Sequence, residues 1–155
     1  MATTNNPVHS APRHARPLPG QLSRRIGYTL AIVLDVVLLV LVNDAPGWQA
    51  LPFLTEDFAA VLWLVNASIV AAVLANAVYV VHDPPWGRAL GDVVTTSVGL
   101  AALVQLWQVF PFAFAQTSVD LDLVARWVLA IGIAGSVVGI VAGAARLVRA
   151  LTPPD

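Results

Sequence analysis

Four long apolar segments occupy most of this chain, at residues 26–42, 58–81, 89–110 and 123–148. A helix needs about 20 apolar residues to cross the hydrocarbon core of a bilayer, which is about 30 Å thick. A soluble bundle would require charged outer faces on its helices, and these segments carry almost no charge. The sequence therefore predicts an all-α polytopic membrane protein, an antiparallel bundle of four transmembrane helices.

The bundle is expected to span residues 23–151, between two tails. Residues 1–22 contain four prolines and no apolar periodicity, so we predict a disordered N-terminal tail, and residues 152–155 form a short C-terminal tail. The first apolar segment follows two arginines, as in a signal peptide, but it ends in Asn43-Asp44-Ala45-Pro46, a poor cleavage site. It is interpreted as a retained transmembrane helix.

The basic residues indicate an orientation. All eight are arginines, and seven of them flank the same ends of the predicted helices: Arg13, Arg16, Arg24, Arg25, Arg88, Arg146 and Arg149. Arg126 alone falls at the opposite end. Because positive charge is retained in the cytoplasm, both termini are expected there, with the protein in the bacterial inner (plasma) membrane.

Composition argues against several function classes. A net charge of -1 gives no signal for binding nucleic acid. The absence of cysteine excludes disulfides, thiol catalysis and thiolate metal sites. His82 and Asp83 beside Pro84-Pro85 make at most half of a metal site and are interpreted as a structural turn. No catalytic constellation, phosphate loop or metal-binding motif is apparent, so the chain is predicted to be non-enzymatic, with no cofactor and no metal.

Asp35 is the outlier among the apolar segments, since it lies near the middle of the first one. A central aspartate costs about 2.5–3.5 kcal/mol on insertion scales, so it is expected to face protein rather than lipid. Three interpretations stay open: a protonated packing residue, a partner for a group on another subunit, or a titrating proton or cation site. The predicted intramembrane polar site combines Asp35 with Asn66, Gln105, Gln108 and Ser136.

Small residues recur every four positions on two segments. They are Gly135, Gly139 and Gly143 on the last segment, and Ala67, Ala71 and Ala75 on the second. Such rows let helix backbones approach closely in a membrane. They predict helix packing, either within the chain or between copies of it.

Aromatic residues gather at the outer half of the predicted bundle. An aromatic belt normally marks both interfaces of a membrane protein, so this excess suggests that the two outer loops form a cap for lipid or for another membrane protein. The predicted cap comprises Trp48, Phe53, Trp107, Phe110, Phe112, Phe114 and Trp127.

Three segments carry a resemblance: Phe53-Leu54-Thr55-Glu56-Asp57-Phe58, Asp83-Pro84-Pro85-Trp86 and Phe110-Pro111-Phe112-Ala113-Phe114. Placed between four spans, they resemble loops of small four-helix bacterial inner-membrane proteins. The resemblance implies neither a named family nor an activity.

The functional expectation follows from packing rather than chemistry. We expect an accessory or assembly subunit of a membrane complex, or a small homo-oligomer, whose partners are the lipid bilayer and other membrane helices. The alternative is a small proton- or cation-coupled transporter centred on Asp35.

Overall fold

The computed structural model describes residues 19–114 and 120–152. These residues form four long helices and one short 3-10 helix: α1 (Pro19–Asn43), η1 (Trp48–Ala50), α2 (Phe58–Val81), α3 (Pro85–Val109) and α4 (Leu121–Leu151). All four long helices have the length and apolar composition to cross a membrane. The prediction of an all-α chain with four helices long and apolar enough to span a membrane is confirmed. The expectations for residues 1–18 and 153–155 lie outside the described residues.

Three helices begin earlier than their apolar segments, α1 and α3 by a turn or more and α4 (Leu121) only slightly. α1 begins at Pro19, inside the segment expected to be a tail, and α3 begins at Pro85. Proline is favoured in the first turn of a helix, because its missing N–H has no partner to lose there and its φ is already helical. The arginines and glutamine that follow Pro19 are good helix formers. Each helix therefore extends past the part of the chain that hydropathy marks.

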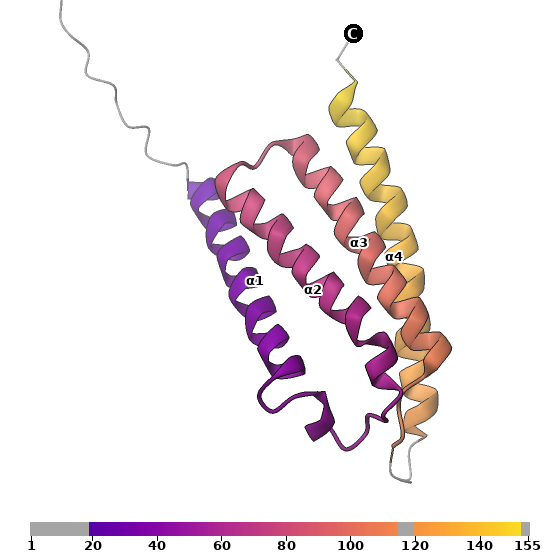
Figure 1. Cartoon of the computed structure of the whole chain (residues 1–155). Helices are drawn as coiled ribbons and strands as arrows, with labels where there is room; N and C mark the ends of the chain where they lie inside the picture. Colours follow the sequence, from indigo (N-terminus) through magenta and orange to yellow (C-terminus); the bar gives the residue numbers. More distant parts are fainter. Residues whose placement is uncertain (1–18, 115–119, 153–155) are drawn as a thin grey trace, which may run out of the picture.

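The four helices lie side by side in an open antiparallel row. In the described part of the chain, helix contacts join α1 to α2, α2 to α3 and α3 to α4, with no contact between more distant helices (Figure 1). This arrangement is more open than a bundle closed around one axis. Because lipid tails are as apolar as the helix surfaces, no hydrophobic force drives such a row to close.

The row has two chemically different ends. The start of α1, the α2–α3 turn and the end of α4 lie together at one end (Figure 1), which we call the basic end because Arg24, Arg88 and Arg146 are there. The η1 loop and residues 110–114 lie at the other, which we call the aromatic end.

Burial is concentrated on the middle of the row. α2 contributes Phe58, Val61, Ile69 and Tyr79 to the buried residues, whereas Leu22–Asn43 of α1 contributes none. The half-buried residues of α1 recur every three or four positions, as expected for one helix face: Tyr28, Ala31, Ile32, Asp35, Leu39 and Val42. This stripe is the side of α1 that packs against α2.

Candidate functional site

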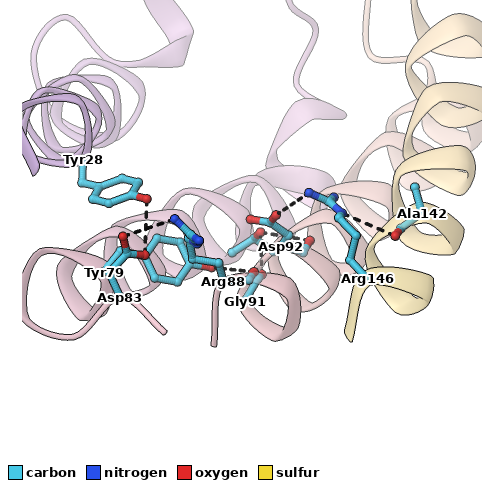
Figure 2. Close-up of polar contacts among 9 residues, drawn as sticks. Tyr28, Tyr79, Asp83, Arg88, Gly91, Asp92, Ala142 and Arg146 are labelled. Carbon is cyan, nitrogen blue, oxygen red and sulfur yellow. Dashed lines mark hydrogen bonds and ion pairs between the residues drawn. The ribbon is translucent and has the colours of Figure 1, made fainter. Parts of the chain in front are cut away.

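A cluster of charged and phenolic side chains joins α1, α2 and α3 at the basic end. The Asp83 carboxylate is its centre: one oxygen, Oδ2, lies 3.4 Å from Arg24 Nε and 3.3 Å from Arg88 Nη1. The other oxygen accepts a hydrogen bond from the Tyr28 hydroxyl at 3.4 Å (Figure 2). One carboxylate in the α2–α3 turn thus links the N-terminal half of α1 to the first turn of α3.

Tyrosine packing continues this cluster into the helix row. The rings of Tyr28 and Tyr79 are 5.4 Å apart between centroids, and the buried Tyr79 hydroxyl donates to the carbonyl oxygen of Arg88 at 3.2 Å. The same hydroxyl faces the backbone of Gly91, and a Cβ atom at that position would overlap it (Figure 2). Gly91 is therefore the position at which α3 admits the tyrosine.

A third ion pair joins α3 to α4 further along the same end. Arg146 Nη1 lies 3.6 Å from Asp92 Oδ2, and Arg146 Nε donates to the carbonyl oxygen of Ala142 at 3.4 Å (Figure 2). Every pair of neighbouring helices is therefore tied at the basic end by at least one polar contact.

Sequence reasoning missed this cluster. It interpreted Asp83 as part of a turn and did not consider Asp92, which lies inside an apolar segment. The charge bias already indicated that Arg24, Arg88 and Arg146 share one end. Asp83 and Asp92 fall at that same end, and this was the signal in the sequence for ion pairs there. Which arginine each carboxylate contacts depends on the lateral order of the helices.

Asp35 lies on the α2-facing stripe of α1 and is half-buried. It is midway between two contacts that set the register of α1 against α2, the Tyr28–Tyr79 ring pair and the Asn43–Asn66 amide pair. This position puts Asp35 at the level of Ala72. Within the described residues, its carboxylate makes no hydrogen bond or ion pair.

The predicted partners of Asp35 are distributed over the row rather than gathered around it. Asn66 pairs with Asn43, each amide nitrogen donating to the other residue's amide oxygen at 2.8 and 2.7 Å. Gln105 donates to the carbonyl oxygen of Ala60 at 3.2 Å, which links α3 to α2. Since α1 contacts neither α3 nor α4 within the described residues, Asp35 does not meet Gln105, Gln108 or Ser136 in a single chain.

The other residues of the predicted polar site line two grooves on opposite sides of α3. One groove, of about 460 Å³, is lined by Ser97, Leu100, Ala101, Val104, Gln105, Gln108 and Val109; we call it the α3 groove. The other, of about 490 Å³, lies between α2, α3 and α4 and includes Ser68, Thr95, Thr96 and Ser136. Its Ser136 hydroxyl donates to the Gly132 carbonyl oxygen at 2.8 Å within α4.

The glycines of α4 contact α3 along a face that differs from the predicted row. A Cβ atom at Gly139 would lie 3.6 Å from Thr96 Cγ2, and one at Gly143 would lie 2.8 Å from Val93 Cγ2. Gly132 also faces α3, but a Cβ at Gly135 would meet nothing within 4 Å. The face that contacts α3 thus contains Gly132 and the glycines seven and eleven residues after it. These spacings keep residues on one helix face better than repeated steps of four, which drift around the axis.

The predicted alanines of α2, Ala67, Ala71 and Ala75, are half-buried.

The two loops at the aromatic end pair with each other through backbone hydrogen bonds. Thr55 N–H donates to the Pro111 carbonyl oxygen at 3.0 Å and Ala113 N–H donates to that of Phe53 at 2.9 Å. The rings of Phe53, Phe112 and Phe114 stack on one another, with centroids 5.8 and 5.9 Å apart. The ring of Phe110 lies 5.4 Å from that of Phe112, so four of the seven predicted cap residues form one cluster.

The other three predicted cap residues have different surroundings. Trp48 packs on Phe58 at 5.4 Å between ring centroids, and Trp127 is 62% exposed. Trp107 shares the Arg126 guanidinium with Phe110, at 5.9 and 4.0 Å from the two ring centroids. Arg126, which falls at the opposite end from Arg24, Arg88 and Arg146, is therefore bound to aromatic faces by cation–π interactions.

Comparisons with protein-family models, curated proteins and solved structures gave no match to this chain. Within residues 19–114 and 120–152, no group of three or more histidine, aspartate or glutamate side chains is arranged to hold a metal ion.

Proposed function

We propose that this chain is a non-enzymatic integral membrane protein that acts by packing against other transmembrane helices. It serves as an accessory or assembly subunit of a membrane complex, or as the protomer of a small homo-oligomer. The observation that carries the proposal is the open row. In the described residues α1 and α4 each contact one neighbouring helix, so each keeps a side free for a partner.

The α3 groove supports this proposal. It lies along the half of α3 nearer the aromatic end and combines Ser97, Gln105 and Gln108 with apolar residues. Polar groups that face hydrocarbon are costly, so polar residues within membrane helices normally face protein or a water-filled cavity. A partner helix with a polar side chain at the same depth would supply hydrogen bonds, which contribute about 0.6 kcal/mol each on average between membrane helices.

Single-cysteine cross-linking tests the proposal cleanly because the chain has no cysteine of its own. Ala101→Cys puts a thiol in the α3 groove, whereas Val78→Cys puts one on an exposed position of α2, 58% accessible, a helix that already has a neighbour on both sides. In membranes, we expect Ala101→Cys to form a disulfide-linked dimer or an adduct with a partner protein. Equal cross-linking at Val78 would indicate random collision.

Native mass spectrometry after gentle extraction provides the complementary measurement. A homo-oligomer or a co-purifying membrane protein is expected. A lone monomer with no co-purifying protein, together with no specific Ala101→Cys adduct, would contradict the proposal.

The proposed location is the bacterial inner membrane, with both termini in the cytoplasm. The arginines at the basic end, including Arg24, Arg88 and Arg146, support this orientation under the positive-inside rule. A reporter fused after Asp155 should be cytoplasmic, and one inserted at Asp44 should be on the outer side. The reverse pattern would overturn the orientation.

The alternative function is a small proton- or cation-coupled transporter centred on Asp35. Its support is the position of that carboxylate, half-buried at the α1–α2 contact without a hydrogen-bond or ion-pair partner in the described residues. Flux into proteoliposomes should then fall in Asp35→Asn and persist in Asp44→Asn, which removes a charge from the loop instead. If wild type and Asp35→Asn are equally inert, the transporter proposal fails.

A further inference from the structure

The basic end contains a cavity of about 300 Å³ next to the Asp83 cluster. It is lined by Arg24, Arg25, Val81, His82, Asp83 and Pro84. Arg24 and Arg88 both contact the Asp83 carboxylate, and Arg25 lines the same cavity, so three arginines stand against one aspartate. The surplus of two positive charges makes this cavity attractive to an anion.

The arginines of the cavity have different roles. Arg24 is held by Asp83 at 3.4 Å, and its side chain remains 48% accessible. Arg25 makes no ion pair within the described residues and is exposed. Arg25 is therefore the cation whose guanidinium is available to a ligand, while Arg24 is a fixed neighbour of the same sign.

An apolar groove begins at the same arginine. It has a volume of about 370 Å³ and is lined by Arg25, Ile26, Thr29, Leu30 and Val33 on the side of α1 away from its α2-facing stripe. The Thr29 hydroxyl donates to the Arg25 carbonyl oxygen at 2.9 Å, so its hydrogen bond is satisfied within the helix. From Arg25 to Val33 the groove follows the helix axis for about 12 Å.

We propose that these two cavities together bind one anionic phospholipid. The phosphate lies between Arg25 and Arg24, and an acyl chain follows the groove past Leu30 towards Val33. The shared position of Arg25 is what distinguishes this site from a general basic surface, because a charged pocket continues directly into an apolar one. Basic pockets beside membrane helices are known to bind anionic headgroups, and guanidinium suits phosphate oxygens geometrically.

This inference does not rest on the proposed packing function, since it requires only that the helices lie in a membrane. The ligand is a lipid rather than a soluble phosphate, because the apolar groove has no role in binding a free anion.

Titration of the detergent-solubilised protein with phosphatidylglycerol, followed by native mass spectrometry, tests the headgroup. We expect wild type to bind it more tightly than phosphatidylcholine, whose headgroup has no net charge. Arg25→Gln should weaken phosphatidylglycerol binding about fivefold, because one basic side chain near anionic lipid contributes about 1 kcal/mol. Arg149→Gln removes the same charge from the last turn of α4, outside the cavity, and should leave binding unchanged.

A second pair of variants tests the acyl groove. Leu30→Trp fills the groove without changing charge and should weaken phosphatidylglycerol binding, whereas Val138→Trp on α4 should not. Thermal unfolding of Arg25→Gln without added lipid should match wild type, since Arg25 holds no ion pair in the described residues. Equal losses in Arg25→Gln and Arg149→Gln, no preference for phosphatidylglycerol, or full competition by inorganic phosphate with Leu30→Trp unaffected would each overturn the proposal.

Discussion

The hydroxyl group of Tyr79 on α2 occupies the space that a side chain at Gly91 on α3 would need. It is fixed there by its hydrogen bond to the Arg88 carbonyl oxygen at 3.2 Å. A larger residue at position 91 would therefore need a smaller one at position 79, because the two residues share one space.

Gly91→Ala should therefore destabilise the α2–α3 contact. The new methyl group would overlap the hydroxyl and lie 2.9 Å from Tyr79 Cζ, and overpacking of a fitted contact typically costs about 1–3 kcal/mol. Thermal unfolding in detergent measures the loss. Tyr79→Phe removes the overlapping atom, so the double variant should lose less stability than the sum of the single variants. Strict additivity would mean that the two residues do not contact each other.

Glycine-to-alanine substitutions along α4 should distinguish the face that contacts α3 from the exposed face by their effects on stability. Gly143→Ala forces a methyl group to within 2.8 Å of Val93 Cγ2, and valine adjusts poorly because its χ1 is restricted in a helix. We expect a loss of stability there, little change for Gly139→Ala, and no loss for Gly135→Ala, which meets open space. Replacing an exposed helical glycine by alanine favours the helix by about 1 kcal/mol. If Gly135→Ala were the most damaging of the three, Gly135 would face a partner helix that the single chain lacks.

Asp83→Asn should weaken the connection between α1 and α3. It removes the carboxylate that holds Arg24 and Arg88, whose side chains are 48% and 35% accessible. Because accessible ion pairs are screened by solvent, we expect a loss of about 1 kcal/mol, shrinking as salt rises. Glu56→Gln, in the loop at the aromatic end, is the matched control. A loss independent of salt would show that the Asp83 contacts are not electrostatic.

At Phe110, we expect substitution by glycine to destabilise the protein less than substitution by alanine. Phe110 adopts a left-handed conformation, with φ 45° and ψ 63°, which costs a non-glycine residue about 1–2 kcal/mol. Its ring is held between Phe112, at 5.4 Å, and the Arg126 guanidinium. Phe110→Ala loses the ring and keeps the strain, whereas Phe110→Gly loses both. We therefore predict that Phe110→Gly unfolds at a higher temperature than Phe110→Ala. The opposite ranking would refute the strain at this position.

The sequence is most informative about α2 and least informative about how the helices meet. Apolar length alone predicted α2 at 58–81, as in the structure, because its ends coincide with polar and proline-rich segments. α1 and α3 extend beyond their apolar segments, since polar helix formers and a first-turn proline continue a helix that hydropathy no longer marks. Helices that are apolar on nearly all sides carry no periodic signal for the choice between a closed bundle and an open row.

The side-chain sites were predicted unevenly for the same reason. Phe53, Phe112 and Phe114 are close in space because the loops that carry them are at the same end, which alternating spans already imply. Asp35 and Gln105 were grouped by depth alone, and depth does not determine which helices are neighbours. To predict the ion pair between Asp83 and Arg24, one would need the lateral order α1–α2–α3 as well as the shared end.

Helix contacts between chain neighbours have a consequence for biogenesis. Each helix can complete its packing within the described chain as soon as the next one has been synthesised, so insertion can proceed hairpin by hairpin with contacts of low sequence separation, which favour rapid folding. The pairing of Leu54 with Phe112 is the exception, since it joins loops on either side of the α2–α3 hairpin. That loop pairing must wait until α3 has crossed the membrane, and it then fastens the first half of the row to the second.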